Sequence, residues 1–428
     1  MPLPPVRRTP RAALRHAALA TLALLAPLAA LPRLAHAQQA AAADSAAGAR
    51  GAVEPGIDVL LADSLHLVRG KRVGLITNHT GRDRRGTSTI DRLHQAPGVR
   101  LTALFGPEHG LRGVAPGGAH IPSTVDSATG IPIHSLYGAT RVPTPAMLAD
   151  VDVLVYDIQD VGARVYTYVW TMALAAETAG KPFIVLDRPN PLGDRVEGGV
   201  LEPEFRSFVG QYPVALRYGL TPGELLRYLV GSGQVRADVA VVPMRGYRRT
   251  MQWDDTGLPW VRPSPNIRDA RAALLYPGTV FFEATNVSEG RGTDRPLRTV
   301  GAPWLADAPA IARALNARRL PGVRFAAVRR RVGRGEKFGG QTIPMVDVEV
   351  TSRDSVRPTE VGAELLRAVY ARHPRQFRWR GRGIEELAGS RALRRAVERG
   401  TVRALVRRWE AESARFARDV EPYRLYPR

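Results

Sequence analysis

The chain contains no cysteine among its 428 residues, and this absence excludes disulfide bonds, thiolate nucleophiles and cysteine-ligated zinc. Lysine is scarce as well, because only Lys71, Lys181 and Lys337 occur and nearly all of the positive charge is arginine. The formal net charge of +21 therefore reflects a general excess of arginine. No compact basic run with interleaved aromatic residues is present, so we expect no nucleic-acid partner.

Long apolar runs are also lacking outside the N-terminus. Arginines at positions 7, 8, 11 and 15 precede an apolar stretch at 17–31, and a small-x-small site follows at 35–37. The apolar stretch contains Pro27 and is shorter than the roughly 20 residues that span a bilayer. We predict a signal peptide at 1–37, a flexible Ala- and Gly-rich leader at 38–56, and an exported, periplasmic or secreted protein with no stable membrane insertion after cleavage. The pattern does not distinguish Sec from Tat export.

Nucleotide-binding and nucleophile motifs are absent too. The first predicted turn, Asn78-His-Thr-Gly81, is not a G-x-G-x-x-G fingerprint, and neither a P-loop nor a G-x-S-x-G elbow occurs. We therefore do not expect the sheet to bind a dinucleotide cofactor or a nucleotide phosphate.

What is present is an alternation of short apolar runs with helical stretches. The expected strands are 72–77, 99–105, 151–156, 182–186 and 239–242, and the expected helices between them are 87–96, 166–179 and 221–230. Such alternation predicts βαβ units, and hence a Rossmann-like, doubly wound parallel sheet in a catalytic domain at 57–275.

Beyond residue 275 the pattern changes. Strand-like pieces are expected at 279–283, 323–329 and 345–350, and helices at 308–317, 359–370 and within the arginine-rich segment 383–418. We interpret 276–428 as a smaller auxiliary α/β domain.

Polar or ionisable residues follow four successive strands of the predicted sheet. In an open parallel sheet, ligands bind outside the carboxyl ends of the strands, so we expect these side chains to share one site. The residues at these ends, in chain order, are Asn78, His79, Glu108, His109, Asp157, Asp160, Asp187, Arg188 and Asn190.

Glu108 is the foremost candidate for catalysis. It lies in a tight loop between Gly106 and Gly110, with apolar Phe105 and Leu111 nearby, and an apolar setting favours the protonated form of a general acid. A carboxylate that only stabilises the loop is the alternative.

Asp157 and Asp160 are candidate partners for Glu108, or else caps of the helix that follows them. Tyr166, Tyr168 and Trp170 are either a stacking surface or core residues. A metal site made of His79, His109 and Asp157 lacks the usual ligand spacing, so we predict none.

A second candidate segment lies in the C-terminal half. Glu289 and Arg291 are held between glycines in Asn286-Val-Ser-Glu-Gly-Arg-Gly-Thr293, which allows close approach to a ligand, although a salt-bridged turn is equally compatible. Asn266, in the rigid loop Pro263-Ser-Pro-Asn266, is expected to face the same cleft.

Several of these segments together resemble the bacterial exo-β-N-acetylmuramidases of the NamZ type. The segments that carry the resemblance are Thr77-Asn-His-Thr-Gly81, Phe105-Gly-Pro-Glu-His-Gly-Leu-Arg-Gly113, Tyr156-Asp-Ile-Gln-Asp-Val-Gly-Ala-Arg-Val-Tyr-Thr-Tyr168, Asp187-Arg-Pro-Asn-Pro-Leu-Gly193, Pro263-Ser-Pro-Asn266 and Thr285-Asn-Val-Ser-Glu-Gly-Arg-Gly-Thr293. The resemblance runs from about residue 57 to the C-terminus.

The resemblance implies an exo-acting glycosidase that works without a cofactor. Its expected action is release of terminal β-1,4-linked N-acetylmuramic acid from the non-reducing end of peptidoglycan fragments, in cell-wall turnover. Glu108 would be the acid, with Asp157, Asp160 or Glu289 as the second carboxyl group. An arginine would clamp the lactyl carboxylate. The expected substrate-binding residues are Asn78, His79, His109, Arg112, Arg164, Tyr166, Tyr168, Arg188, Asn190, Asn266, Asn286 and Arg291.

Two other functions stay open at this point. The same polar strand ends would suit a peptidoglycan- or sugar-binding protein without catalysis, or a metal-dependent cell-wall hydrolase or deacetylase. The stereochemical outcome, tolerance of a peptide stem and the oligomeric state do not follow from the sequence.

Overall fold

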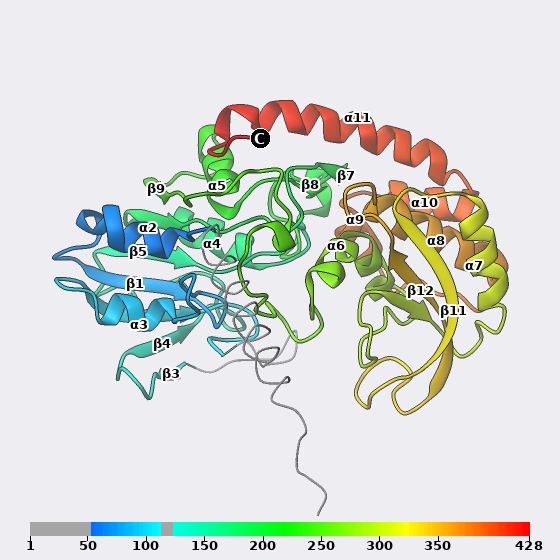
Figure 1. Cartoon of the computed structure of the whole chain (residues 1–428), viewed down its shortest axis with the longest axis horizontal. Helices are drawn as coiled ribbons and strands as arrows, with labels where there is room; N and C mark the ends of the chain where they lie inside the picture. Colours follow the sequence, from blue (N-terminus) through cyan, green and yellow to red (C-terminus); the bar gives the residue numbers. More distant parts are fainter. Residues whose placement is uncertain (1–52, 113–122) are drawn as a thin grey trace, which may run out of the picture. The chain divides into compact units, whose positions relative to one another are not determined.

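A seven-stranded sheet organises the N-terminal half of the computed structural model, which describes residues 53–112 and 123–428 (Figure 1). The predicted signal peptide lies outside the described residues. The strands are β1 (Arg72–Thr77), β2 (Arg100–Gly106), β3 (Thr124–Val125), β4 (Pro132–Ser135), β5 (Val153–Asp157), β6 (Phe183–Leu186), β7 (Glu197–Val200), β8 (Ala215–Arg217), β9 (Val239–Val242), β10 (Thr299–Gly301), β11 (Val323–Arg331) and β12 (Thr342–Val350).

Helices connect most of these strands. The α-helices are α2 (Gly56–Asp63), α3 (Thr89–His94), α4 (Tyr168–Thr178), α5 (Pro222–Gly231), α6 (Ala270–Thr279), α7 (Ala308–Ala317), α8 (Pro358–Arg372), α9 (Gly383–Ala388), α10 (Ala392–Arg399) and α11 (Val402–Val420). The 3₁₀ helices are η1 (Leu65–Leu67), η2 (Pro203–Phe205), η3 (Trp253–Asp255), η4 (Val280–Ala284) and η5 (Glu421–Tyr423).

The large sheet has the strand order of a doubly wound Rossmann-like fold. Its spatial order is β3-β4-β2-β1-β5-β6-β9, and all neighbours are parallel except β3 and β4. The strand order reverses between β1 and β5, where Thr77 pairs with Asp157. This reversal is the topological switch point, beside which such sheets bind their ligands. The predicted fold class is confirmed.

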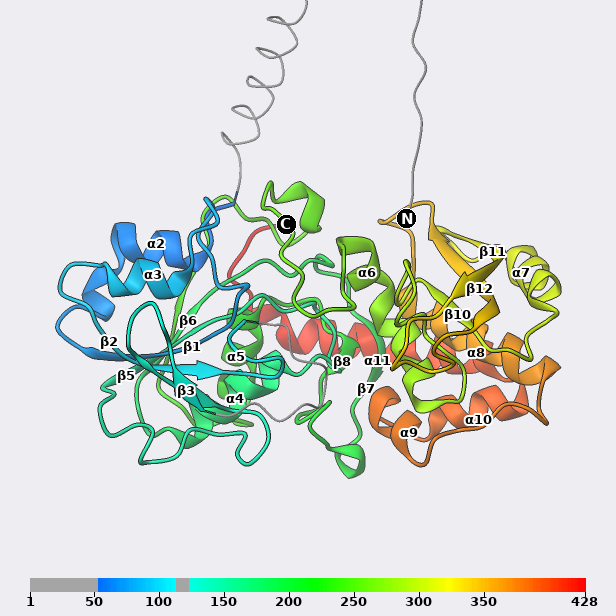
Figure 2. The ribbon, with the colours of Figure 1, turned by 90° about the horizontal axis from the view of Figure 1, so that it is seen from below.

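Helices cover both faces of this sheet, because alternate residues of each buried strand point to opposite faces. On one face, Leu154 and Tyr156 pack with residues of α4 and α5, and on the other Val153 and Val155 pack with α2 and α3. Figure 2 shows α2 and α3 on one side of the sheet and α4 and α5 on the other.

The C-terminal half forms a smaller α/β layer, in which α7 and α8 pack beside the antiparallel sheet β10-β12-β11. From α10, α11 returns along β7 and β8, and η5 contacts α5 (Figure 1). The predicted boundary at 275/276 falls inside the continuous helix α6, so its position stays a prediction.

Two local predictions are corrected. The segment 279–283, expected as a strand, is the end of α6 followed by η4. Residues 279–282 are buried, and a short apolar run does not distinguish a strand from a buried helix.

The flexible leader predicted at 38–56 extends too far along the chain. Val53 and Glu54 are hydrogen-bonded through their N–H groups to the carbonyls of Thr256 and Arg245, at 2.9 Å each, and α2 begins at Gly56. The folded structure therefore includes residues 53–56.

Candidate active site

The loop after β2 presents Glu108. The N–H of Gly110 donates to the carbonyl of Pro107 at 2.9 Å, which closes a tight turn around Glu108 and His109. His109 has φ of +68°, a left-handed conformation that only a few per cent of non-glycine residues adopt. Such strain is characteristic of functional loops, where the surrounding structure holds it in place.

Glu108 lies on the wall of a polar cavity of about 660 Å³, a volume in the usual range for small-ligand sites. Both halves of the chain contribute to its wall. The lining residues are Glu108, His109, Tyr137, Val165, Tyr166, Thr167, Phe208, Val209, Ser264, Pro265, Asn266, Ile267, Tyr276, Glu283, Arg291, Leu297, Gly335 and Glu336. Of the predicted site residues, the structure brings together Glu108, His109, Tyr166, Asn266 and Arg291 here.

Thr167 orients the Glu108 carboxyl group. Thr167 is the N-cap residue of α4, but its hydroxyl does not cap that helix. Instead it donates to Oε2 of Glu108 at 2.7 Å. The start of α4 thus fixes a carboxyl that comes from the loop after β2.

Glu283 is a second acidic group on this wall, and sequence reasoning missed it. It belongs to η4, and its side chain is about one-third exposed (32%) and pairs with Arg291. Burial raises the pKa of Glu283, nearby Glu289 raises it further, and Arg291 opposes both. A raised carboxyl pKa in a cavity is a recognised mark of acid–base chemistry.

Tyr276 connects the two acidic sides of the cavity. Burial raises the pKa of its phenol, both Glu283 and Glu108 add to that rise, and all three residues line the cavity. Its ring meets that of Tyr166 edge to face, with centroids 5.9 Å apart. The aromatic wall therefore runs between Glu108 and Glu283.

Asp157 does not line this cavity, although it ends β5 beside the switch point. Arg188 donates to both of its carboxylate oxygens, with Nη2–Oδ2 at 2.9 Å, and the Thr89 hydroxyl donates as well. Asp157 is fully buried. Its placement indicates an ion pair that joins β5 to the loop after β6, so it does not make the direct contact with a ligand that we expected.

Asp160 also lies beneath the cavity. Its Oδ2 accepts hydrogen bonds from the Tyr218 hydroxyl and, at 2.7 Å, from the N–H of Gly162. Burial raises the pKa of Asp160 to about 7. The group is only 2% exposed, so it supports the loop after β5 and does not face a ligand.

Glu289 is likewise turned away from the main cavity. It pairs with Arg291 (Nε–Oε1 3.1 Å) and with Lys337 (Nζ–Oε2 2.9 Å), and its side chain is 5% exposed. It lines an adjoining space of about 470 Å³ that shares Glu283 and Arg291 with the main cavity. The predicted salt-bridged turn is what the structure shows.

Most of the remaining predicted binding residues form hydrogen bonds with backbone groups. Arg164 donates to the carbonyl of Leu387 at 3.0 Å, and Asn190 bonds Leu192 and Leu220. Those that do not line the cavity are Asn78, His79, Arg112, Arg164, Tyr168, Arg188, Asn190 and Asn286.

The metal alternative finds no support in the arrangement of donors. Nε2 of His79 lies 2.6 Å from the carbonyl of Arg262, and burial lowers the pKa of this histidine. Within residues 53–112 and 123–428, no group of three His, Asp or Glu side chains is placed to hold a metal ion.

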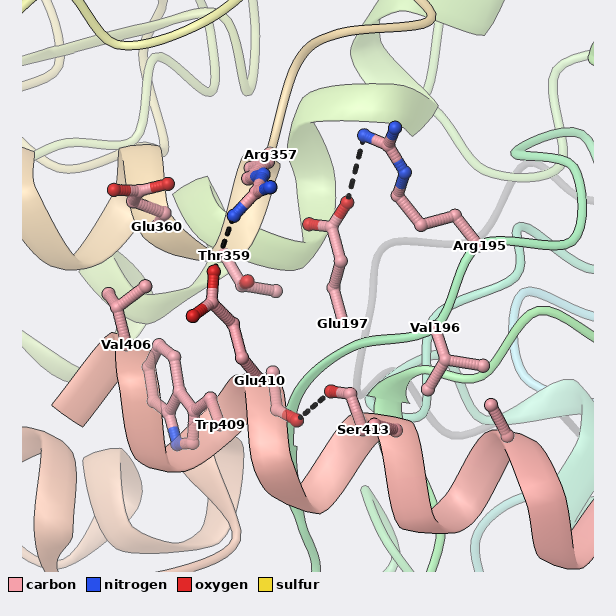
Figure 3. A pocket seen from close by; sticks show the side chains of 13 residues that line it. Arg195, Val196, Glu197, Arg357, Thr359, Glu360, Val406, Trp409, Glu410 and Ser413 are labelled. Atoms are coloured by element: carbon pink, nitrogen blue, oxygen red, sulfur yellow. Dashed lines mark hydrogen bonds and ion pairs between the residues drawn. The ribbon is translucent and has the colours of Figure 1, made fainter.

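A second cavity, of about 290 Å³, lies between β7, the start of α8 and α11 (Figure 3). Its charged groups are engaged with one another: Arg357 pairs with Glu410 at 2.5 Å, and Glu197 pairs with Arg217 at 2.9 Å. It shares no lining residue with the Glu108 cavity. The Arg357–Glu410 pair joins α11 to the start of α8, and the Ser413 hydroxyl, which donates to the carbonyl of Gly198 at 2.9 Å, holds α11 against β7.

Three carboxyl groups, those of Glu108, Glu283 and Glu336, and several aromatic rings line one polar cavity at the carboxyl end of a Rossmann-like sheet, an arrangement that suits a glycoside hydrolase. Comparison with known proteins gives the family. The family model described as "Exo-beta-N-acetylmuramidase NamZ, N-terminal" matches residues 73–271, and its C-terminal counterpart matches 274–426. The chain belongs to the NamZ family.

Individual relatives agree with this assignment. The chain is 42% identical over 380 residues to the peptidoglycan β-N-acetylmuramidase NamZ of Bacillus subtilis (strain 168), covering 87% of this chain and 91% of the relative. Two solved structures of DUF1343 family proteins from Bacteroides fragilis NCTC 9343 are similar, each covering 88% of this chain and 99% of its own. Their TM-scores are 0.81 and 0.69, at 38% and 29% identity.

No helix in the described ranges combines the length and the apolar character needed to cross a membrane.

Proposed function

We propose that this chain is an exo-β-N-acetylmuramidase that releases terminal β-1,4-linked N-acetylmuramic acid from the non-reducing end of peptidoglycan fragments during cell-wall turnover. The observation that carries the proposal is Glu108, held by Thr167 on the wall of a cavity built from both family domains. The Bacillus subtilis relative, a peptidoglycan β-N-acetylmuramidase, supports the choice of substrate.

Glu108 acts as the general acid in this proposal. Its carboxyl gives a proton to the glycosidic oxygen as the bond to the anomeric carbon breaks. The rings of Tyr166 and Tyr276 provide an apolar face for the sugar, and Asn266 offers an amide to its hydroxyls. Arg291 is the arginine of the cavity wall, and we assign to it the carboxylate of the lactyl group.

Replacement of Glu108 by glutamine tests this role. Glutamine keeps the shape of the side chain and still accepts from Thr167, but it has no acidic proton. We expect release of N-acetylmuramic acid from disaccharide muropeptides to fall by about 10²–10⁴-fold. Glu386→Gln, an exposed position on α9, is the matched control and should leave the rate unchanged. Full turnover by Glu108→Gln, folded as judged by circular dichroism, would remove Glu108 from this role.

A sugar-binding protein without catalysis is one alternative. Calorimetry with muropeptides, together with a product assay, separates the two functions: binding without product would favour this alternative.

The proposal includes export to the periplasm or the medium, because peptidoglycan lies outside the cytoplasmic membrane. It is supported by the basic and apolar N-terminal segments and the small-x-small site at 35–37. Mature protein beginning at Gln38 is the expected product.

A further inference from the structure

Glycoside hydrolysis ordinarily uses two carboxyl groups, and the cavity contains acidic side chains besides Glu108. They are Glu283 and Glu336, both of which line it. Asp157 and Asp160 are buried behind the wall, and Glu289 lines only the adjoining space, where Lys337 and Arg291 pair with it. The second carboxyl group is therefore to be sought between Glu283 and Glu336.

Glu283 is held in place, whereas Glu336 is not. Arg291 donates to Oε1 of Glu283, and Arg291 is itself fixed by Glu289 (Nε–Oε1 3.1 Å). Glu336 lies in the turn between β11 and β12, and nothing in the described ranges bonds its carboxyl group. A catalytic carboxylate must be held within a fraction of an ångström of its working position, which favours Glu283.

Lys337 fixes the segment that carries Glu283. Its ammonium donates to the carbonyls of Phe282 (2.8 Å) and Val287 (3.0 Å) and to Oε2 of Glu289 (2.9 Å). The carbonyl of Glu283 is a fourth, longer acceptor at 3.4 Å, and acceptors that converge on one point suit a compact ammonium group better than a planar guanidinium. The chain uses arginine almost everywhere else, so a half-buried lysine here is consistent with a requirement for this geometry.

We propose that Glu283 is the second carboxyl group of the reaction and acts as general base toward the attacking water, and that Lys337 is a positioning residue for it. The inference rests on the proposed muramidase activity. It assigns to Glu283 a role that we first expected of Asp157, Asp160 or Glu289.

The step is balanced in atoms and charge. The bond between the anomeric carbon and the glycosidic oxygen breaks, and that oxygen takes the proton of Glu108. The water oxygen bonds to the anomeric carbon, and its proton passes to the Glu283 carboxylate. One carboxyl loses a proton and the other gains one, and exchange with solvent restores both.

Comparison of leaving groups separates the two roles. We would measure kcat of wild type, Glu108→Gln and Glu283→Gln on a disaccharide muropeptide and on 4-nitrophenyl β-N-acetylmuramide, whose leaving group needs no proton. Both variants should lose about 10²–10⁴-fold on the muropeptide. Glu108→Gln should recover most of its rate on the nitrophenyl substrate, whereas Glu283→Gln should lose the same factor on both.

The pH profile gives a second readout. A general base works as its carboxylate, so the wild-type rate should fall at acid pH as Glu283 is protonated, and Glu283→Gln should lose this acid limb. Lys337→Met removes a cation near Glu283 and should move the limb to higher pH. The ionisable groups that face Glu283 from the surrounding elements are Glu108, Tyr276, Glu289, Arg291, Glu336, Lys337 and Arg380.

Glu386→Gln, at an exposed position of α9 away from the cavity, is the control, and its rates should stay within about twofold of wild type. Loss of turnover in Glu336→Gln, with Glu283→Gln still active, would overturn the assignment. If Glu283→Gln is poorly folded, Glu283→Asp, which withdraws the carboxylate by one methylene, should show the same loss on both substrates. A wild-type enzyme that releases no sugar would refute the muramidase function itself, and this inference with it.

Discussion

Two buried aspartates, Asp160 and Asp187, allow a sharp test of the electrostatics of this fold. Burial raises the pKa of each to about 7, from 3.8 in an exposed chain. Their hydrogen bonds differ. Oδ1 of Asp160 has no partner within the described residues. Both oxygens of Asp187 are occupied by donors, among them the hydroxyls of Thr221 and Tyr426 at 2.6 Å each.

The sign of the pH effect follows from the direction of these shifts. Between about pH 4 and pH 7 the folded protein keeps a proton on each aspartate that the unfolded chain has released. The free energy of unfolding therefore falls as pH rises through this window, and the loss is complete above the folded pKa. A shift from 3.8 to about 7 corresponds to roughly 4 kcal/mol for each group, as an upper limit.

Asparagine at the two positions should have opposite effects at neutral pH. In Asp160→Asn the amide nitrogen can take the place of Oδ1, so its oxygen still accepts from Tyr218 and Gly162 and no charge is buried. In Asp187→Asn the amide nitrogen must replace one of the two carboxylate oxygens, and each of these oxygens accepts from two donors. Two buried donors without acceptors cost about 2–6 kcal/mol.

Urea unfolding followed by tryptophan fluorescence, at about pH 5 and about pH 8, measures both effects. Wild type should be less stable at the higher pH through both aspartates. Asp160→Asn should lose part of this dependence and be at least as stable as wild type at pH 8, whereas Asp187→Asn should be destabilised at both. An Asp160→Asn protein that follows the wild-type pH dependence, or unfolds as readily as Asp187→Asn, would refute the reasoning.

Two further predictions concern packing and export. A Cβ on Gly278 of α6 would lie 1.8 Å from the carbonyl oxygen of Pro358, so Gly278→Ala should destabilise the fold by about 1–3 kcal/mol or more. Gly383→Ala should change the stability little, because no atom lies nearer than 3.4 Å to its added Cβ. Thermal unfolding of the two variants measures the difference. Mass spectrometry of protein recovered from the producing cells should find an N-terminus at Gln38, and an intact Met1 on all of the protein would contradict cleavage.

Much of the fold was predictable because its elements have clear ends and periods. The strand 239–242 and the helix 308–317 occur with the predicted bounds, as β9 and α7. The capping box of Thr221 and Glu224, with proline at the first helical position, begins α5 as expected. The strands β3, β7 and β8 were not predicted, because unlike β9 they are not continuous apolar runs of four residues.

The candidate site was less predictable, because a polar residue at a strand end has two possible uses. Glu108 faces the cavity. Asp157 ends β5 and is buried in an ion pair, and Asp160 follows β5 and is buried in hydrogen bonds. Nothing local in the sequence separates these cases. Glu283 was missed because it ends an apolar run interpreted as a strand, and its partner Arg291 comes from a different turn.

The position of the cavity follows from how the switch point is filled. A dinucleotide-binding sheet leaves the gap between the first and fourth strands open for a pyrophosphate. Here Thr80 donates to Oδ1 of Asn78 at 2.6 Å and accepts from the N–H of Gln159 at 2.9 Å, so the loops after β1 and β5 are bonded directly across that gap. The Asp157–Arg188 pair fills the space beside them. With the switch point closed, the next available opening is at the end of β2, where Glu108 lies. The C-terminal residues then complete the wall with Glu283 and Arg291. The same side chains that close the switch point thus account for a cavity that needs both halves of the chain.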